Sequence, residues 1–181
     1  LFFTLCKNKL PPETSLAAQP PKPTVSVSPK LLPAADAELF SAATATRPTR
    51  ERLLVLLVED DPFTRKLAAS TLKGQYDVAE AGDAAEALRL YNKLAPDMVF
   101  LDIELPDASG HVVLSRLLAL DPEAFVAMLS ANSIKENILA ALEKGAKGFV
   151  TKPFAKEKLL HYLHLCTSQK QSALSRHGAS A

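Results

Sequence analysis

Five short apolar runs alternate along the chain with segments of helical periodicity, and this alternation restricts the possible folds more than any other feature. Each run is bounded by turn-forming residues and is apolar on both faces, as is typical of a parallel strand covered on both sides. The runs are Leu53–Val58, Tyr76–Ala81, Met98–Leu101, Phe125–Leu129 and Gly148–Thr151. Five consecutive strand–helix units predict an α/β domain with a doubly wound, five-stranded parallel sheet.

The helical segments between the runs begin and end at recognisable signals. Asp83 and Asp61 suit the N-cap position, and Pro62 follows at the first helical position, where proline is tolerated. Ser133 and Glu136 have the spacing of a capping box. The predicted helices run from Pro62 to a stop at Gly74, and over Asp83–Leu94, Ser109–Leu120, Ser133–Lys144 and Pro153–Leu165.

The two flanks of this region differ from it in composition. Residues 11–50 contain eight of the 13 prolines and no glycine, which predicts a semi-rigid, disordered linker over residues 1–51. The stretch AADAELFSAA, residues 34–43, suits a helix of one or two turns, but an isolated helix that short is marginal in water. The folded domain is expected to span residues 52–166, and the polar residues 167–181 are expected to form a disordered tail.

Charge and cysteine content exclude several classes of protein. The formal net charge is +1, and no basic stripe marks a surface for direct binding of nucleic acid. No apolar run reaches the length of a transmembrane helix, so this segment is not expected to enter a membrane. The two cysteines, Cys6 and Cys166, are too few for a disulfide framework. We therefore expect a reducing compartment, either the cytoplasm or the cytoplasmic side of a membrane-bound protein.

Polar side chains stand where four of the five runs end. They are Glu59–Asp61 after the first run, Asp102 with Glu104 after the third, Ser130 after the fourth and Lys152 after the fifth. In an open parallel sheet these ends meet at one edge, where ligands bind. Two like charges about 4 Å apart near a protein surface repel by roughly 4 kcal/mol, so the carboxylates need a cation. With Mg²⁺ they form an oxygen site that holds phosphate, and the lysine and the hydroxyl complete a site for phosphoryl transfer.

Four motifs around these residues resemble a known family. VLLVEDDPFTR, PDMVFLDIELPDASG, AMLSAN and GFVTKPF occur in this order, and together they are similar to the response-regulator receiver domain of two-component signalling. The resemblance covers about Arg52–Cys166. It implies a flavodoxin-like sheet with strand order 2-1-3-4-5. It also implies transfer of a phosphoryl group from a phosphohistidine to an aspartate, with a histidine kinase or a histidine phosphotransfer protein as donor.

The resemblance further implies which residues accept the phosphoryl group and hold the metal. On this basis Asp102 is the phosphoacceptor and also a ligand of Mg²⁺. Asp60 is a direct ligand, Glu59 holds the ion mainly through water, and the backbone carbonyl of Glu104 completes the protein ligands. Glu59 stands where the family more often has an aspartate.

The remaining implied roles concern the response to phosphorylation. Lys152 pairs with Asp102 and then with the phosphoryl oxygens, Ser130 is the switch hydroxyl, and Phe149 occupies the aromatic switch position. The face formed by residues 133–165 is then expected to change shape and to bind a downstream protein or a second copy. Leu160 and Tyr162 are expected to be exposed on that face.

Other interpretations of these residues remain open. The acids can cap the following helix, Asp102 can form a turn, and Phe149 suits an ordinary core position. A receiver that docks a partner without being phosphorylated is an alternative function. A Mg²⁺-dependent phosphatase that works through an aspartyl phosphate is another. Against the haloacid-dehalogenase type, the acids here are consecutive and the candidate nucleophile follows the third strand. The start LFFTL also resembles the last strand of a histidine-kinase ATPase domain, as in hybrid kinases.

Overall fold

The computed structural model describes residues 34–131 and 135–178, and its centre is a parallel sheet of five strands. The strand order is β2-β1-β3-β4-β5, as expected for a flavodoxin-like α/β fold. The strands are β1 (Leu54–Val58), β2 (Asp77–Ala81), β3 (Met98–Asp102), β4 (Val126–Ser130) and β5 (Gly148–Thr151). Each predicted run corresponds to one strand, and the bounds of run and strand agree within one residue at each end. The predicted fold class is confirmed.

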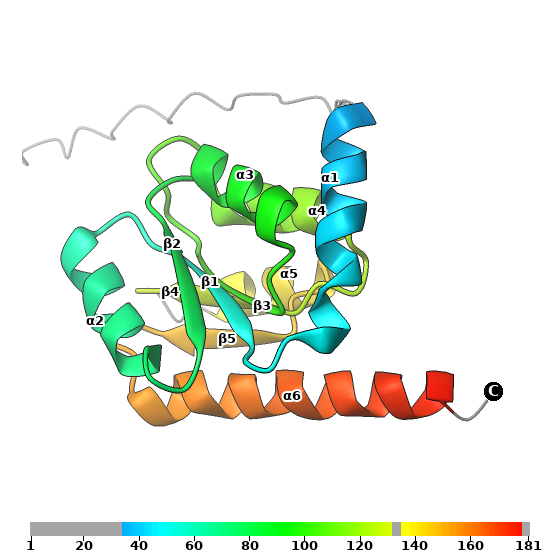
Figure 1. The fold of residues 1–181 in the computed structure, drawn as a ribbon. Helices are drawn as coiled ribbons and strands as arrows, with labels where there is room; N and C mark the ends of the chain where they lie inside the picture. The colour runs from blue at the N-terminus through cyan, green and yellow to red at the C-terminus, as the bar shows by residue number, and fades with distance from the viewer. Residues whose placement is uncertain (1–33, 132–134, 179–181) are drawn as a thin grey trace, which may run out of the picture.

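Helices cover both faces of the sheet (Figure 1). In β1, Val55 and Leu57 pack on one side while Leu56 and Val58 pack on the other, and all four have no exposed surface. The described helices are α1 (Ala34–Ala45), α2 (Pro62–Leu72), α3 (Ala84–Leu94), α4 (Gly110–Leu120), α5 (Lys135–Glu143) and α6 (Lys156–Gly178). Helices α2 and α6 contribute to one core layer and α3, α4 and α5 to the other, so both faces of every central strand are buried.

Capping residues fix where three helices begin, and two of them, Asp61 and Asp83, were predicted from the sequence. Asp61, Asp83 and Ser109 each accept a hydrogen bond from a backbone N–H in the first turn of α2, α3 and α4. These bonds satisfy donors that have no partner within the helix. The capping box predicted from Ser133 lies partly outside the described residues, as does the strand suggested at Leu1–Leu5.

The residues before β1 are folded from residue 34 onward, in contrast to the expected disordered linker. Helix α1 lies beside α3, and the Phe40 ring stacks on Tyr91 with ring centroids 5.8 Å apart. The Arg47 guanidinium is 5.8 Å from the centroid of each of these rings. Arg47 also pairs with Asp121 at 2.6 Å, and Tyr91 donates to the same carboxylate oxygen at 2.7 Å. Tertiary contacts thus stabilise a helix that would be marginal alone.

The end of the chain also differs from the expected disordered tail. Helix α6 continues past Cys166 to Gly178, well beyond the end of the sheet (Figure 1). No proline or glycine interrupts it, and Lys170 pairs with Asp97 at 2.9 Å. Asp97 also pairs with Arg50 at 3.3 Å, so both flanks of the domain meet at one buried carboxylate.

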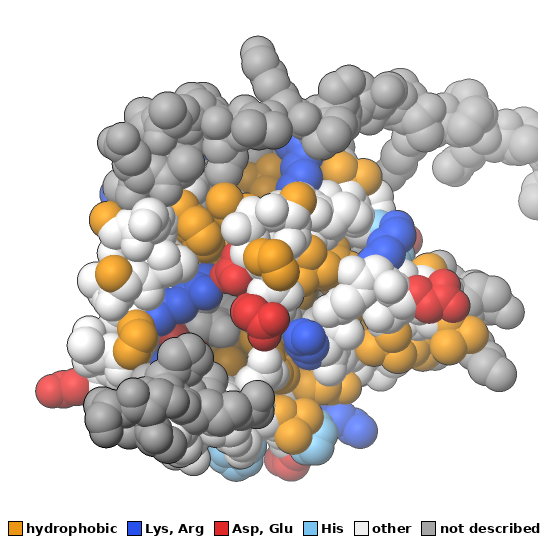
Figure 2. Space-filling model, turned by 90° about the vertical axis from the view of Figure 1, so that its right-hand side faces the viewer, with side chains coloured by type: hydrophobic (Ala, Val, Ile, Leu, Met, Phe, Trp, Pro, Cys, Tyr) orange, Lys and Arg blue, Asp and Glu red, His pale blue; other side chains and the backbone are white. Residues whose placement is uncertain are grey.

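The end of the molecule that carries α1 and the last turns of α6 faces the viewer in Figure 2. Basic, acidic and hydrophobic side chains are interspersed on the part of this face that the structure describes, without a continuous field of one charge. Among the described helices, none is both long enough and apolar enough to cross a membrane.

Candidate functional site

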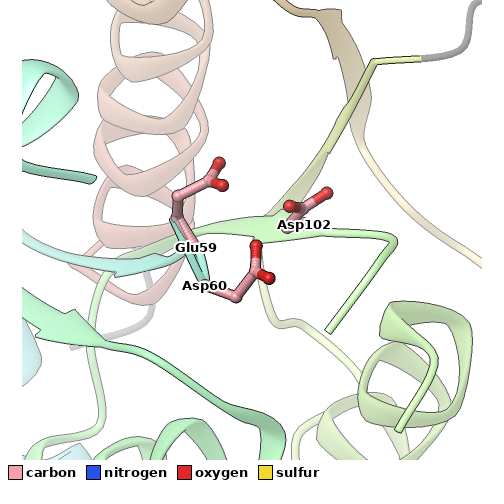
Figure 3. A group of neighbouring side chains, drawn as sticks. All are labelled: Glu59, Asp60 and Asp102. Atoms are coloured by element: carbon pink, nitrogen blue, oxygen red, sulfur yellow. The ribbon is translucent and has the colours of Figure 1, made fainter. Parts of the chain in front are cut away.

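Three carboxylates gather at the carboxyl edge of the sheet. Glu59 and Asp60 directly follow β1, Asp102 is the last residue of β3, and these two strands are neighbours. The three side chains lie close together in Figure 3, and one oxygen of each is within 4.8 Å of the others. Glu59 and Asp102 are buried, whereas Asp60 is exposed to solvent. The fold therefore brings together the acids that the sequence places at the ends of two strands.

Lys152 supplies the positive charge next to these acids. Its Nζ atom lies 2.5 Å from Asp102 Oδ2 and 2.6 Å from Glu59 Oε2. The lysine follows β5, so the pair joins strands on opposite sides of β4. Burial lowers the pKa of Lys152, but its bonds to the two carboxylates outweigh this effect and the pKa is raised overall. Lys152 is therefore a fixed cation at neutral pH.

Glu59 is a carboxylate in an unfavourable environment. Burial raises its pKa, the hydrogen bond and charge of Lys152 oppose the shift, and the negative charge of Asp102 adds to it. Although Oε2 is within ion-pair distance of Lys152, it accepts no hydrogen bond of normal geometry from the described part of the chain. A buried oxygen in this state has capacity for a further positive or proton-donating partner.

The loop after β3 shapes the opening beside Asp102. Asp102 Oδ1 accepts a hydrogen bond from the backbone N–H of Glu104 at 3.3 Å. The start of α4 packs so closely that a Cβ on Gly110 would lie 2.0 Å from the Asp102 carbonyl oxygen, so only glycine fits there. The resulting pocket, about 220 Å³ in volume, is lined by Asp60, Asp102, Glu104, Leu105, Pro106, Ala131 and Lys152.

Ser130 lies on β4, the neighbour of β3, and Phe149 lies on β5, the next strand beyond β4. Ser130 is buried at the end of β4, and its backbone carbonyl accepts a hydrogen bond from the Lys152 N–H at 2.8 Å. Phe149 is half-buried on β5 and packs against the core layer of α3 and α4. Every residue predicted for the site is thus at or near this edge, with Phe149 three positions before Lys152.

Two residues with a part in positioning the site were not found from the sequence. The Arg65 guanidinium donates to the backbone carbonyl of Glu59 at 2.5 Å and to that of Asp60 at 3.2 Å, which fixes the acidic loop. Asp107 accepts from the N–H groups of Ala84 and Ala85 and so holds the loop after β3 against α3. Arg65 lies one helical turn after Asp61, and this spacing is the sequence signal that its side chain can reach the acidic loop.

The donor set of this site suits a hard divalent cation. The candidate ligands are all oxygen atoms, and two of the three carboxylates are buried next to a single lysine. Mg²⁺ prefers carboxylate and carbonyl oxygens and usually binds phosphate at the same time. The acidic cluster and the open pocket therefore fit Mg²⁺ together with a phosphoryl group.

Comparison with known proteins agrees with this chemistry. The sequence model of one protein family, the response regulator receiver domain, matches residues 55–164. The chain belongs to the response regulator receiver domain family. The chemotaxis protein CheY of Listeria monocytogenes is 37% identical over 113 residues, which are 61% of this chain and 95% of that protein.

Solved receiver structures have the same fold. A two-component response regulator of the LuxR family from Aurantimonas sp. SI85-9A1 has a TM-score of 0.61 at 29% identity, over 65% of this chain and 87% of that one. The BeF3-activated DrrB receiver domain has a TM-score of 0.60, also at 29% identity, over 65% and 98% of the two chains. As a receiver domain, this protein accepts a phosphoryl group in two-component signalling. Receiver domains interact with histidine kinases or phosphotransfer proteins and generally use Mg²⁺ at an acidic pocket.

Proposed function

We propose that Asp102 is the residue that accepts the phosphoryl group from a phosphohistidine. The observation that supports this assignment is the contact of its Oδ2 atom with Lys152 at 2.5 Å, in a pocket that also contains Asp60. A carboxylate oxygen of Asp102 attacks phosphorus, the P–N bond to the donor imidazole breaks, and the electron pair of that bond leaves with the imidazole. Placement of the reacting groups and neutralisation of charge provide most of the catalysis.

Mg²⁺ is the cofactor that these residues suit. Asp60 and Asp102 would bind the ion directly, Glu59 mainly through water, and the backbone carbonyl of Glu104 would complete the protein ligands. The ion supplies positive charge to the phosphoryl oxygens. Glu59 and Asp102 are buried and of like charge, so an added cation also relieves their repulsion.

Lys152 and Ser130 are the groups that respond to phosphate on Asp102. The lysine, already within ion-pair distance of Asp102, pairs with the phosphoryl oxygens after transfer. The Ser130 hydroxyl is a donor at the end of the adjacent strand and moves toward the phosphate. Phe149 then turns inward, and the face formed by residues 133–165 becomes the surface read by a downstream protein or a second copy.

The cytoplasm is the compartment in which we propose that this domain acts. The chain has only two cysteines, too few for a disulfide framework, which is typical of proteins in a reducing compartment. Phosphohistidine donors of the proposed kind would meet the domain there.

The substitution Asp102→Asn tests the proposed acceptor. The variant should fold but carry no acid-labile phosphate after incubation with acetyl phosphate and Mg²⁺, or with a phosphorylated histidine phosphotransfer protein. Asp77→Asn is the matched control, because Asp77 is an exposed aspartate at the start of β2 and lies outside the acidic cluster. Undiminished phosphate on folded Asp102→Asn would exclude Asp102. If the wild-type protein also carries no acid-labile phosphate, the result would instead favour a docking module that is not phosphorylated.

A further inference from the structure

The edge strand β5 is held by a side chain from α6. The Phe149 N–H donates to the Tyr162 hydroxyl at 3.2 Å, and the same hydroxyl donates to the Phe149 carbonyl at 3.3 Å. Strand β5 is the last in the sheet, so one edge of it has no neighbouring strand to bind. One hydroxyl can donate and accept at once, and Tyr162 thus satisfies both backbone groups of a single residue on β5.

The residue before Phe149 makes this contact possible. A Cβ on Gly148 would lie 2.0 Å from Cε1 of the Tyr162 ring and 2.5 Å from its Cζ. The ring therefore packs directly against the backbone of β5, and no residue other than glycine leaves it that space. Tyr162 is half-buried rather than exposed, in contrast to the expectation from the sequence.

The contact links the two core layers around the edge of the sheet. Phe149 directs its side chain to the layer of α3 and α4, whereas Tyr162 packs with the layer of α2 and α6. Lys152 follows Phe149 by three residues and contacts Asp102 directly at 2.5 Å. If a displacement that begins at Asp102 and Lys152 reaches the backbone of Phe149, it must either carry Tyr162 along or break its bonds to Phe149.

We propose that Tyr162 is a positioning residue for the response to phosphorylation: its hydroxyl ties β5 to α6 and passes a displacement of Phe149 on to that helix. This proposal rests on the proposed function of Asp102 and Lys152. It deepens that function by naming the contact through which α6 becomes part of the surface read by a partner.

The variant Tyr162→Phe keeps the ring over Gly148 and removes only the hydroxyl. Without any ligand, hydrogen exchange of the Phe149 amide should become about five- to tenfold faster, since a hydrogen bond is lost at an edge strand. On addition of beryllofluoride and Mg²⁺, amide shifts around Asp102 should persist while the shifts in α6 near Leu163 should be lost. Tyr76→Phe is the control, because Tyr76 packs on the same core layer but away from β5.

Two outcomes would overturn the proposal: unchanged exchange of the Phe149 amide in Tyr162→Phe, or an α6 response equal to that of the wild type. Gly148→Ala tests the same contact from the strand, because the new Cβ displaces the ring, and it should give the same loss of response. An undisturbed Phe149 amide in Gly148→Ala would also count against the contact. If the amide shifts around Asp102 in the wild type do not change with beryllofluoride and Mg²⁺, the proposed function fails. The hydrogen exchange of the Phe149 amide still tests the hydrogen bonds between Tyr162 and β5.

Discussion

Asp97 directly precedes strand β3 and Asp102 is its last residue, and each carboxylate forms ion pairs with distant parts of the chain. Asp102 pairs with Lys152 at 2.5 Å, whereas Asp97 pairs with Arg50 at 3.3 Å and with Lys170 at 2.9 Å. The segment before β1 and the extension of α6 are therefore attached to the strand that carries the proposed phosphoacceptor. The ion pairs of Asp97 therefore contribute to the stability of the domain, whereas Asp102 is the proposed reacting residue.

Replacing Asp97 with Ala should destabilise the fold strongly. The Asp97 side chain is 3% exposed, and its removal leaves Arg50 and Lys170 without this partner and the Leu54 N–H without its acceptor. Breaking a buried pair in this way costs roughly 2–4 kcal/mol after allowance for the partly exposed cations. Urea denaturation of both proteins measures the loss in free energy of unfolding.

The matched control for this substitution is Asp77→Ala. Asp77 pairs with Arg52 at 3.4 Å, but the two side chains are 58% and 44% exposed. Exposed pairs of this kind contribute less than about 1 kcal/mol. Equal losses for Asp97→Ala and Asp77→Ala would show that Asp97 does not hold the two flanks.

Removal of residues 1–50 should lower stability much more than removal of residues 1–33. The longer deletion removes Phe40 from Tyr91 and leaves the buried Asp121 carboxylate without Arg47. An unpaired buried charge and the lost packing together cost several kcal/mol, which lowers the melting temperature by roughly 5–15 °C. Calorimetry of the two truncated proteins tests this. Similar melting temperatures would mean that α1 contributes nothing to the domain.

The parts of the structure that the sequence predicted are those determined by local pattern. Each strand is a continuous apolar run between turn formers, and Asp102 and Lys152 were found because polar residues at strand ends converge in a parallel sheet. The predicted disorder of residues 34–51 and 167–178 was wrong, because the order of these segments depends on long-range contacts. Arg47 binds Asp121, which is 74 residues away, and Lys170 binds Asp97 at a separation of 73. Composition and periodicity do not reveal such pairs. A proline-rich flank with a short helix is therefore predicted to be disordered.

Cys166 should be almost unreactive in the folded protein. Burial raises the pKa of its thiol to about 12, and the nearby charge of Asp97 adds to the shift. The reactive species is the thiolate, so a Cys6→Ser variant should react with a disulfide reagent at pH 8 far more slowly when folded than in urea. Comparable rates in the two conditions would contradict the burial of Cys166.

The same shift predicts the sign of a pH effect on stability. Between the ordinary thiol pKa of about 8.5 and the raised value of about 12, the unfolded chain has lost a proton that the folded chain keeps. The contribution of Cys166 to the free energy of unfolding is therefore complete below about pH 8.5 and falls as the pH rises, by up to about 1.4 kcal/mol per unit. Wild-type stability should decline more steeply between pH 8 and pH 10 than that of Cys166→Ala.

Mg²⁺ should stabilise the wild-type domain and should stabilise Asp60→Ala much less. Glu59, Asp60 and Asp102 are like charges within 4.8 Å of one another, so a cation that binds only the folded state raises the free energy of unfolding. At 100 times its dissociation constant the gain is about 2.7 kcal/mol. In the absence of Mg²⁺ the variant should be as stable as the wild type or slightly more stable, because one repulsive contact is removed.

Thermal unfolding over a Mg²⁺ titration tests both parts of this expectation. Glu104→Ala is the control, because Glu104 is proposed to bind the ion through its backbone carbonyl, which the substitution keeps. Its Mg²⁺-dependent shift should therefore stay close to that of the wild type, while the shift of Asp60→Ala is mostly lost. If Asp60→Ala retains the full shift and Glu104→Ala does not, the ion is bound by the loop after β3 and Asp60 is not its ligand.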